Sequence, residues 1–283
     1  MTGARAVLPT GLRERALALA AGELSPAPVR DAATVALLRD APGGHEVYLL
    51  RRVRGMAFAG GMHVFPGGSV DPADARADGL GWAGPPPSAW AADLRCDEAL
   101  ARALVCAAVR ETFEESGVLL AGPSQDEVLD DVSTDEWEAE RTALEAREQS
   151  LSDLLERRRL VLRTDLLRPL AHWITPEVEP KRFDTRFFVA RVPAGQTCRD
   201  VGTEADRRLW VRPSDALAAA ASDALTLMPP TLAALEDLAG HADVEESLAA
   251  PRTLQTVLPR AVVDADGEVR LVDLVVGAPD EHG

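Results

Sequence analysis

The stretch "VRETFEESGV", residues 109–118, places three glutamates within about one and a half turns of a predicted helix and then ends at a glycine. Glu111, Glu114 and Glu115 stand at positions i, i+3 and i+4, so they share one face of that helix. Like charges at this spacing repel one another. The sequence therefore needs a physical reason for keeping the three carboxylates together.

The helix that carries these glutamates is predicted to run from about Asp97 to Ser116, with Gly117 as a left-handed C-terminal stop. The glutamate face continues upstream as an apolar stripe made of Leu100, Leu104, Ala107 and Ala108. The opposite side of the helix is also apolar, with Val105, Cys106, Val109 and Phe113. Because a helix that is apolar on both sides lies between layers, we expect the three carboxylates to be partly buried.

Partly buried carboxylates need cations to offset their repulsion and their loss of hydration. Ligands that are all oxygen atoms suit Mg²⁺ or Mn²⁺, which keep several waters and bridge substrate phosphates. The sequence therefore predicts a divalent metal site on this helix. The alternative interpretation is a solvated acidic face without a ligand.

Composition limits the classes of protein to which the chain can belong. Its 283 residues are 46% hydrophobic and 27% charged, which is typical of a globular chain with a sizeable core. The net charge of −16 argues against nucleic acid or an anionic membrane as the main partner. Cys96, Cys106 and Cys198 have no CxxC spacing, so we expect free thiols in a reducing cytoplasm. The first 22 residues predict a surface helix and not a signal peptide, and no stretch approaches a membrane span.

Strands and helices alternate along the chain, and no internal repeat or flexible linker interrupts them. Periodicity and turn residues predict strands at 34–40, 45–53, 118–122, 168–176, 185–193 and 207–213. Helices are predicted after residue 213 and at 229–241, and a hairpin at 258–276 with "DADG" as its turn. Three segments have other characters: a glycine-rich loop with a short strand at 55–74, an irregular proline-rich insertion at 75–98, and a helical insertion at 124–160.

The spacing of "RETFEESG", residues 110–117, resembles the end of the Nudix box, R-E-U-x-E-E-x-G-U, where U is aliphatic. The box of that family opens with G-x5-E, and "GSVDPAD", residues 68–74, supplies Gly68 and then Asp74 in place of the glutamate. The segment "FPGG", residues 65–68, precedes it. Both halves of the box are present in order, and the resemblance covers about residues 34–215.

Two departures from the family pattern stand out. The stretch from Asp74 to Arg110 is far longer than usual, so the proline-rich insertion would split the box, and Thr112 occupies a position that is usually aliphatic. These departures leave the role of Asp74 open, but they do not touch the three glutamates. The role of the helical insertion is also open between dimerisation and covering the substrate.

The resemblance implies an α/β fold, a Nudix α/β/α sandwich with a mixed central sheet. It implies a single domain over 1–283, with a core at about 34–215, insertions at about 75–98 and 124–160, and C-terminal helices and a hairpin at 216–283. It also implies water attack on a nucleoside diphosphate linked to another group, assisted by Mg²⁺ or Mn²⁺.

Residue roles follow from the same resemblance. Glu111, Glu114 and Glu115, with the backbone carbonyl of Gly68, would hold the metal, and Arg110 would orient the glutamates through a buried ion pair. The catalytic base is expected to be Glu204, in a predicted loop before the strand at 207–213, with Glu115 or Glu114 as the alternative.

The stretch at 47–74, with its basic residues, "FPGG" and "DPAD", resembles the coenzyme A-cleaving and acyl-CoA-cleaving Nudix subgroup. In such a substrate the phosphates would be bound by basic residues, and the candidates are Arg51, Arg52, Arg54, Lys181 and Arg182. An adenine ring would stack on an aromatic side chain, and the candidates are Phe65, Trp173 and Phe183, although a core role is the competing interpretation for each. His63 and His172 are interpreted as structural residues.

Three hypotheses about function therefore stand. The first is hydrolysis of coenzyme A or acyl-CoA to 3′,5′-ADP and 4′-phosphopantetheine or its acyl form. The second is a Nudix pyrophosphatase for ADP-ribose, dinucleotides or other nucleotide diphosphates, because substrate choice lies in loops. The third is a Nudix-like module that senses a nucleotide without cleaving it. In each case the partner is a small nucleotide diphosphate, and a homodimer is compatible with the sequence.

Overall fold

The computed structural model describes residues 8–55, 59–76, 79–202, 204–263 and 268–276. Its centre is a mixed nine-stranded sheet in which β1 is parallel to β9, and β8 is parallel to β11. Seven strands follow one another across this sheet in the order β10 (Ala205–Val211), β2 (Gly44–Arg52), β1 (Val29–Ala41), β9 (Arg182–Arg191), β8 (Leu167–Ile174), β11 (Thr256–Val263) and β12 (Val269–Val276). Two short strands complete it: β3 (His63–Val64) beside β2, and β4 (Gly67–Ser69) beside β1.

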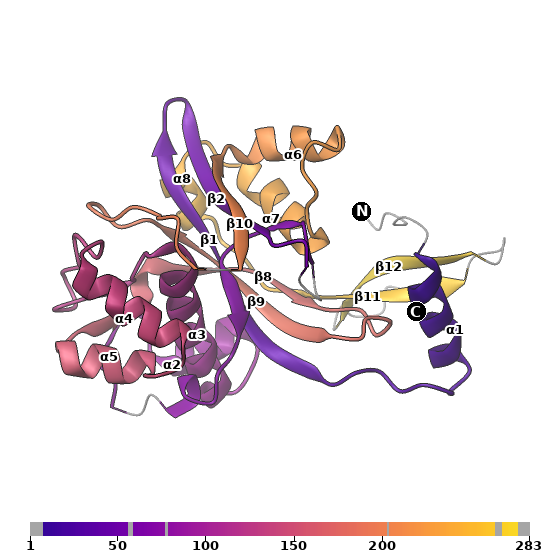
Figure 1. Cartoon of the computed structure of the whole chain (residues 1–283), viewed down its shortest axis with the longest axis horizontal. Helices are drawn as coiled ribbons and strands as arrows, with labels where there is room; N and C mark the ends of the chain where they lie inside the picture. The colour runs from indigo at the N-terminus through magenta and orange to yellow at the C-terminus, as the bar shows by residue number, and fades with distance from the viewer. Residues whose placement is uncertain (1–7, 56–58, 77–78, 203, 264–267, 277–283) are drawn as a thin grey trace.

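Helices cover both faces of the sheet, as Figure 1 shows. On one face lie α2 (Pro87–Leu94), α3 (Glu98–Ser116), α4 (Asp135–Glu145) and α5 (Leu151–Arg158). On the other face lie α6 (Pro213–Ala221), α7 (Pro229–Ala239) and α8 (Val244–Ala249). This arrangement confirms the predicted α/β/α sandwich.

The middle of strand β1 is buried on both faces because residues 35–38 are all apolar. Val35 and Leu37 face the core beneath α3, whereas Ala36 and Leu38 face the core beneath α7. Successive side chains of a strand point to opposite faces, so one continuous apolar run supplies two cores. Strand β1 therefore fixes the position of the sheet between its two helix layers.

A third, smaller core lies at one end of the sheet, where α1 (Thr10–Ala20) packs on the hairpin β11–β12 (Figure 1). Leu8, Ala16, Val178 and Val269 are its buried members. A separate small sheet of β5 (Trp82–Ala83), β7 (Val161–Arg163) and β6 (Ala121–Gly122) joins the two insertions. Two 3₁₀ turns, η1 (Asp74–Arg76) and η2 (Thr164–Leu166), complete the list of elements.

Helix α3 forms as the sequence predicts. The side chain of Asp97 accepts a hydrogen bond from the Leu100 amide at 2.8 Å, which caps the first turn. Gly117 ends the helix with φ = 72°. Residues on both sides of α3 are buried, since β1 packs on one side and α2 and α4 pack on others. The helix lies between layers, as its two apolar faces predict.

Most other elements agree with the sequence analysis, with shifted ends. The strands predicted at 34–40, 45–53, 168–176, 185–193 and 207–213 all form, as do the helices at the N-terminus, within 124–160, after 213 and at 229–241. The two strands of the hairpin predicted at 258–276 form too, but its expected turn at 264–267 lies outside the described residues. Helix α8 was not predicted.

Two predictions about local structure are wrong. The segment 75–98 is not irregular, because its proline triplet begins α2: Pro87 occupies the first turn, where a missing N–H costs nothing. The strand predicted at 118–122 is limited to Ala121–Gly122. The buried backbone of Leu119 has a side-chain partner instead of a strand. The Gln196 side-chain oxygen accepts from the Leu119 N–H at 2.9 Å, and its NH₂ group donates to the Leu119 carbonyl at 3.0 Å.

In the described part of the chain, no helix combines the length and the apolar character that crossing a membrane requires.

The end of α3 gives a first prediction. A Cβ atom on Gly117 would lie 2.7 Å from the Arg199 side chain, in a left-handed backbone conformation. We expect Gly117→Ala to lower the free energy of unfolding by about 1–2 kcal/mol, measured by urea denaturation. Gly11→Ala is the control, because nothing lies within 4 Å of its Cβ position in α1. Equal stability of the two variants would contradict the role given to Gly117.

Candidate functional site

A long cavity of about 860 Å³ runs across one face of the sheet. Each of seven adjacent strands contributes at least one residue to its lining, and these include Arg208 of β10, Arg52 of β2, Thr34 of β1, Thr185 of β9, Trp173 of β8, Pro259 of β11 and Leu271 of β12. Six inter-strand spacings correspond to about 29 Å. The cavity thus has room for an extended ligand, and the glutamates of α3 belong to its lining.

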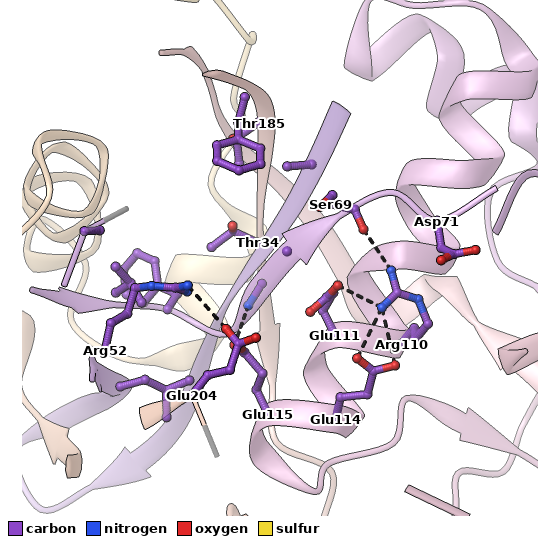
Figure 2. A pocket seen from close by; sticks show the side chains of 18 of the residues that line it. Thr34, Arg52, Ser69, Asp71, Arg110, Glu111, Glu114, Glu115, Thr185 and Glu204 are labelled. Carbon is purple, nitrogen blue, oxygen red and sulfur yellow. Dashed lines mark hydrogen bonds and ion pairs between the residues drawn. The ribbon is translucent and has the colours of Figure 1, made fainter. Parts of the chain in front are cut away.

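Arg110 lies at the centre of the polar end (Figure 2). Its guanidinium donates to Asp74 at 2.9 Å, to Glu111 at 2.8 Å and to Glu114 at 3.2 Å. It also donates to the backbone carbonyl of Ser69 at 3.0 Å. One buried cation therefore contacts three carboxylates and the backbone of one strand.

Asp74, in the first half of the split box, contacts Arg110 in the second half. Its side chain is only 2% exposed and receives two guanidinium nitrogens of Arg110, although 36 positions separate the two residues in the sequence. The Asp71 amide donates to Asp74 at 2.8 Å, and Asp71 in turn accepts from the Ala73 amide at 2.8 Å. This turn sets Asp74 against α3. The aspartate therefore lies directly against Arg110 of α3 despite the long insertion between them.

The glycines of "FPGG" bring the backbone of β4 onto the carboxylates. The Gly67 amide donates to Glu115 at 2.8 Å. A Cβ atom on Gly68 would lie 2.5 Å from the Glu111 carboxylate, and one on Gly67 would lie 2.4 Å from the Thr34 hydroxyl. Only glycine permits this approach. The backbone of Gly68, which the sequence analysis included in the metal set, therefore lies directly beside Glu111.

Burial disfavours the ionised form of the three glutamates when no further cation is present. Loss of hydration raises the pKa of Glu111, of Glu115 and of Glu114, the last to about 7, with the neighbouring carboxylates adding to each shift. Arg110 opposes the shift for Glu111 and Glu114. Burial also disfavours the Arg110 cation, but its carboxylate partners outweigh this and raise its pKa. The cluster thus contains more negative charge than Arg110 alone can balance.

The donor set fits a hard divalent cation, because it consists of carboxylate and backbone oxygens. Among the residues that the structure describes, no three acidic, histidine or cysteine side chains already form a ligand cluster. The reason is visible in Figure 2, where Arg110 draws the carboxylates of Glu111 and Glu114 toward itself. Glu115 differs, since its carboxylate accepts from the Gly67 amide.

Glu204 lines the cavity beside Arg52 and next to Glu115 of α3 (Figure 2). Arg52 contacts it at 3.3 Å, and the Glu204 side chain is 59% exposed. The Glu204 carbonyl accepts from the Val53 amide at 2.9 Å, which fixes its backbone next to the end of β2. The role of Glu204 as a base stays a prediction, and the structure places its accessible carboxylate among the residues that line the cavity.

The predicted basic residues divide into two groups. Arg52 and Lys181 line the cavity, whereas Arg51, Arg54 and Arg182 are not among the described residues of its lining. Arg51 pairs with Asp206 at 2.7 Å. Arg182 is buried and donates to the carbonyls of Thr175, at 3.0 Å, and Ala27, at 3.1 Å. Its position next to Lys181 was misleading, because alternate side chains of a strand face opposite ways.

The aromatic candidates Phe65, Trp173 and Phe183 all line the cavity, and the first two are more than 90% buried. His63 and His172 have structural partners: the Thr226 carbonyl at 3.3 Å and Asp184 at 2.5 Å. The sequence analysis missed Arg76, Arg147 and Arg208, which also line the cavity. Arg147 belongs to the turn between α4 and α5, and no sequence signal placed that turn over the site.

Comparison with known proteins agrees with this geometry. The family model for the NUDT19 Nudix domain matches residues 92–238, just over half of the chain. The chain belongs to this Nudix family. The matched region includes α3 and the helical insertion, while Gly67, Gly68 and Asp74 precede it.

Relatives and a solved structure agree with this assignment. The Nudix chain is 27% identical over 237 residues to an acyl-coenzyme A diphosphatase NUDT19 of Xenopus laevis, covering 71% of this chain and 62% of that protein. It is 27% identical over 317 residues to the protein of the same name from Gallus gallus, covering 90% and 82%. A crystal structure of a Nudix hydrolase from Alicyclobacillus acidocaldarius superposes with a TM-score of 0.70 at 30% identity, covering 80% of this chain and 98% of the other. The chain is therefore a Nudix hydrolase.

The Arg110 cluster gives a second prediction, about stability. Asp74→Ala leaves Arg110 without its most buried partner, so we expect the free energy of unfolding to fall by about 3 kcal/mol in chemical denaturation. The matched control is Asp206→Ala, which breaks an arginine pair of similar length at the surface and should change stability little. A loss for Asp74→Ala no larger than for the control would show that the buried pair does not hold η1 to α3.

Glu114 gives a third prediction, about pH. Its folded pKa of about 7 lies above its ordinary value of 4.5, so the folded state binds more protons between these values. The contribution of Glu114 to stability therefore falls as pH rises from about 4.5 to about 7, by up to about 3 kcal/mol. Denaturation with chelator present should show wild type losing stability relative to Glu114→Gln over this range. A difference that stays constant with pH would contradict the assignment.

Proposed function

We propose that this Nudix hydrolase cleaves the diphosphate of coenzyme A or acyl-CoA with Mg²⁺ or Mn²⁺, releasing 3′,5′-ADP and 4′-phosphopantetheine or its acyl form. The observation that carries this proposal is that the carboxylate cluster lines a cavity to which seven adjacent strands also contribute. A diphosphate at the cluster leaves space for a long substituent along the sheet. The names of the curated relatives support the same substrate class.

The cluster residues would hold the reacting groups in place. Glu111, Glu114 and Glu115, with the carbonyl of Gly68, would bind the cation, and Arg110 would fix the orientation of the first two glutamates. A bound divalent cation would neutralise the diphosphate oxygens and lower the pKa of the attacking water. The protein's own contribution is then to place carboxylates, backbone and water in one geometry before the substrate arrives.

Glu204 would act as the general base. Its exposed carboxylate faces the cluster and would accept the proton of the water that attacks phosphorus, while the phosphate–phosphate oxygen bridge breaks. Arg52, its neighbour at 3.3 Å, would hold it in position and approach the diphosphate. Glu115 and Glu114 are the alternative bases.

The rest of the substrate would lie along the cavity. Trp173 and Phe183 present aromatic surface for an adenine ring, and Lys181, whose ammonium lies 5.3 Å from the Phe183 ring centre, supplies a cation for its 3′-phosphate. The turn between α4 and α5 also lines the cavity, which favours a covering role for the helical insertion over dimerisation.

The test is turnover of coenzyme A, an acyl-CoA, ADP-ribose and a dinucleotide with Mg²⁺ or Mn²⁺, with products separated by chromatography. We expect coenzyme A or its thioester to be preferred and to give 3′,5′-ADP, and we expect chelator to abolish the reaction. Preference for ADP-ribose or the dinucleotide would reject the coenzyme A proposal but keep the diphosphatase chemistry. Binding without cleavage would favour a nucleotide sensor.

The same assay tests the residue roles. Glu115→Gln should lower kcat by at least about a hundredfold while the protein still melts cooperatively, because a ligand acts mainly on the transition state. Glu98→Gln is the control, since Glu98 is exposed at the other end of the same helix. Near-full activity of Glu115→Gln would reject the metal-site assignment.

A further inference from the structure

The last turn of α3 carries Glu114 and Glu115, and the structure satisfies its carbonyl groups in an unusual way. The end of any helix leaves carbonyls without partners inside the helix. Here Gly117 donates to the Phe113 carbonyl at 2.9 Å and the Arg199 amide donates to the Ser116 carbonyl at 2.8 Å. The Glu114 carbonyl accepts from the side chain of Arg141, at 2.8 Å. This last donor comes from α4, in the helical insertion.

Neighbouring carboxylates hold the Arg141 side chain in place for this contact. Its side chain is only 5% exposed, and it pairs with Glu138 at 2.7 Å and Glu145 at 2.8 Å on its own helix. The same terminal nitrogen that contacts Glu145 also reaches the Glu114 carbonyl. Two carboxylates thus neutralise a buried cation and hold its donors toward α3. A cation near the C-terminus of a helix is also favoured by the helix dipole.

A second arginine, Arg199, also contacts Glu138 beside the end of α3. Glu138 accepts from Arg199 at 2.9 Å as well as from Arg141, and Arg199 also donates to the Val132 carbonyl at 3.2 Å. Next to these polar contacts, Trp137 of α4 packs edge-on against Phe113 of α3, with ring centres 6.3 Å apart. The insertion therefore contacts the last turn of α3 directly through one aromatic contact and one hydrogen bond, from Arg141 to the Glu114 carbonyl. It also binds Arg199, whose amide donates to the Ser116 carbonyl.

These contacts between α4 and the last turn of α3 involve the part of the helix that carries Glu114 and Glu115, which the proposed reaction needs. Glu114 extends its carboxylate to Arg110 on one side of α3 and gives its carbonyl to Arg141 on another. A shift of the last turn would therefore move Glu114 and Glu115 together. Misplacement of catalytic groups by about 1 Å is costly to rate even when the fold is intact.

We propose that Arg141 is a positioning residue, which fixes the last turn of α3 so that Glu114 and Glu115 are correctly placed for the metal and the diphosphate. The inference rests on the proposed metal site. Under this proposal the helical insertion does more than line the cavity. It also fixes the position of α3 relative to β4, whose Gly67 amide donates to Glu115.

The test compares Arg141→Met with Arg252→Met. Arg252 is a matched control because it is also a buried arginine, 7% exposed, that pairs with Asp237 at 2.6 Å and donates to a helix carbonyl, that of Ser247, at 2.8 Å. It serves α8 and makes none of these contacts with α3. Both variants should melt at lower temperature than wild type, so loss of stability alone will not distinguish them.

Two measurements, made where both variants are folded, separate positioning from stability. Turnover of coenzyme A should show kcat lowered tenfold to a hundredfold in Arg141→Met, with KM changed less than threefold, and both constants unchanged in Arg252→Met. Calorimetric titration with Mn²⁺ alone should show a dissociation constant at least tenfold higher for Arg141→Met only. Arg141→Lys, which keeps a charged donor, should recover part of both losses.

Each outcome decides a point. If Arg141→Met and Arg252→Met match in kcat and Mn²⁺ affinity, the positioning role is wrong. If wild type cleaves no coenzyme A but Arg141→Met still weakens Mn²⁺ binding selectively, the positioning role stands and the proposed substrate fails. If Arg141→Met does not fold, Glu138→Gln takes its place, because it loosens Arg141 without lining the cavity. A folded Glu138→Gln with wild-type kcat and Mn²⁺ affinity would reject the proposal.

Discussion

The contact between Arg110 and its carboxylates is the constraint on which the rest of the site depends. One guanidinium joins η1, β4 and α3 by binding Asp74, the Ser69 carbonyl and two glutamates. Breaking a buried pair is expensive because it leaves a charge without a partner. The surplus of negative charge beside Arg110 in turn makes the place attractive to another cation. The same electrostatic imbalance thus underlies both the fold of the site and the metal binding that we propose for it.

Sequence patterns predicted the parts of this arrangement that are local. The ends of α3 followed from Asp97 and Gly117, and its burial followed from apolar residues on both sides. The three glutamates could be grouped because helix periodicity places them on one face. The glycine pair at 67–68 was recognised as a motif, although the close approach that requires glycine is evident only from the distances. The family assignment and the sandwich architecture rested on these same patterns.

The parts that sequence could not predict depend on contacts between distant segments. Asp74 had an open role because nothing local shows that the insertion returns the chain to Arg110. Arg182 looked like a partner for a phosphate, but its strand turns it toward backbone carbonyls. No strand forms at 118–120. The backbone of Leu119 is instead bonded by the side-chain amide of Gln196, although 77 positions separate the two residues. Arg141 had no signal at all, since an i, i+4 pattern of charges is usual on solvated helices.

The parallel pairing of β1 with β9 has a consequence for how the molecule folds. The register joins Val29 to Arg182 and continues to Leu38 and Arg191, so the middle of the sheet forms from the two ends of a very long loop. Contacts of this kind form slowly, because the entropy of closing the loop is lost before the pairing stabilises it. Helix α3 lies inside that loop and is held together by local contacts, so it can form while its glutamates are still hydrated and ionised. The energetic cost of burying them is then met when α3 docks against β1 and β4.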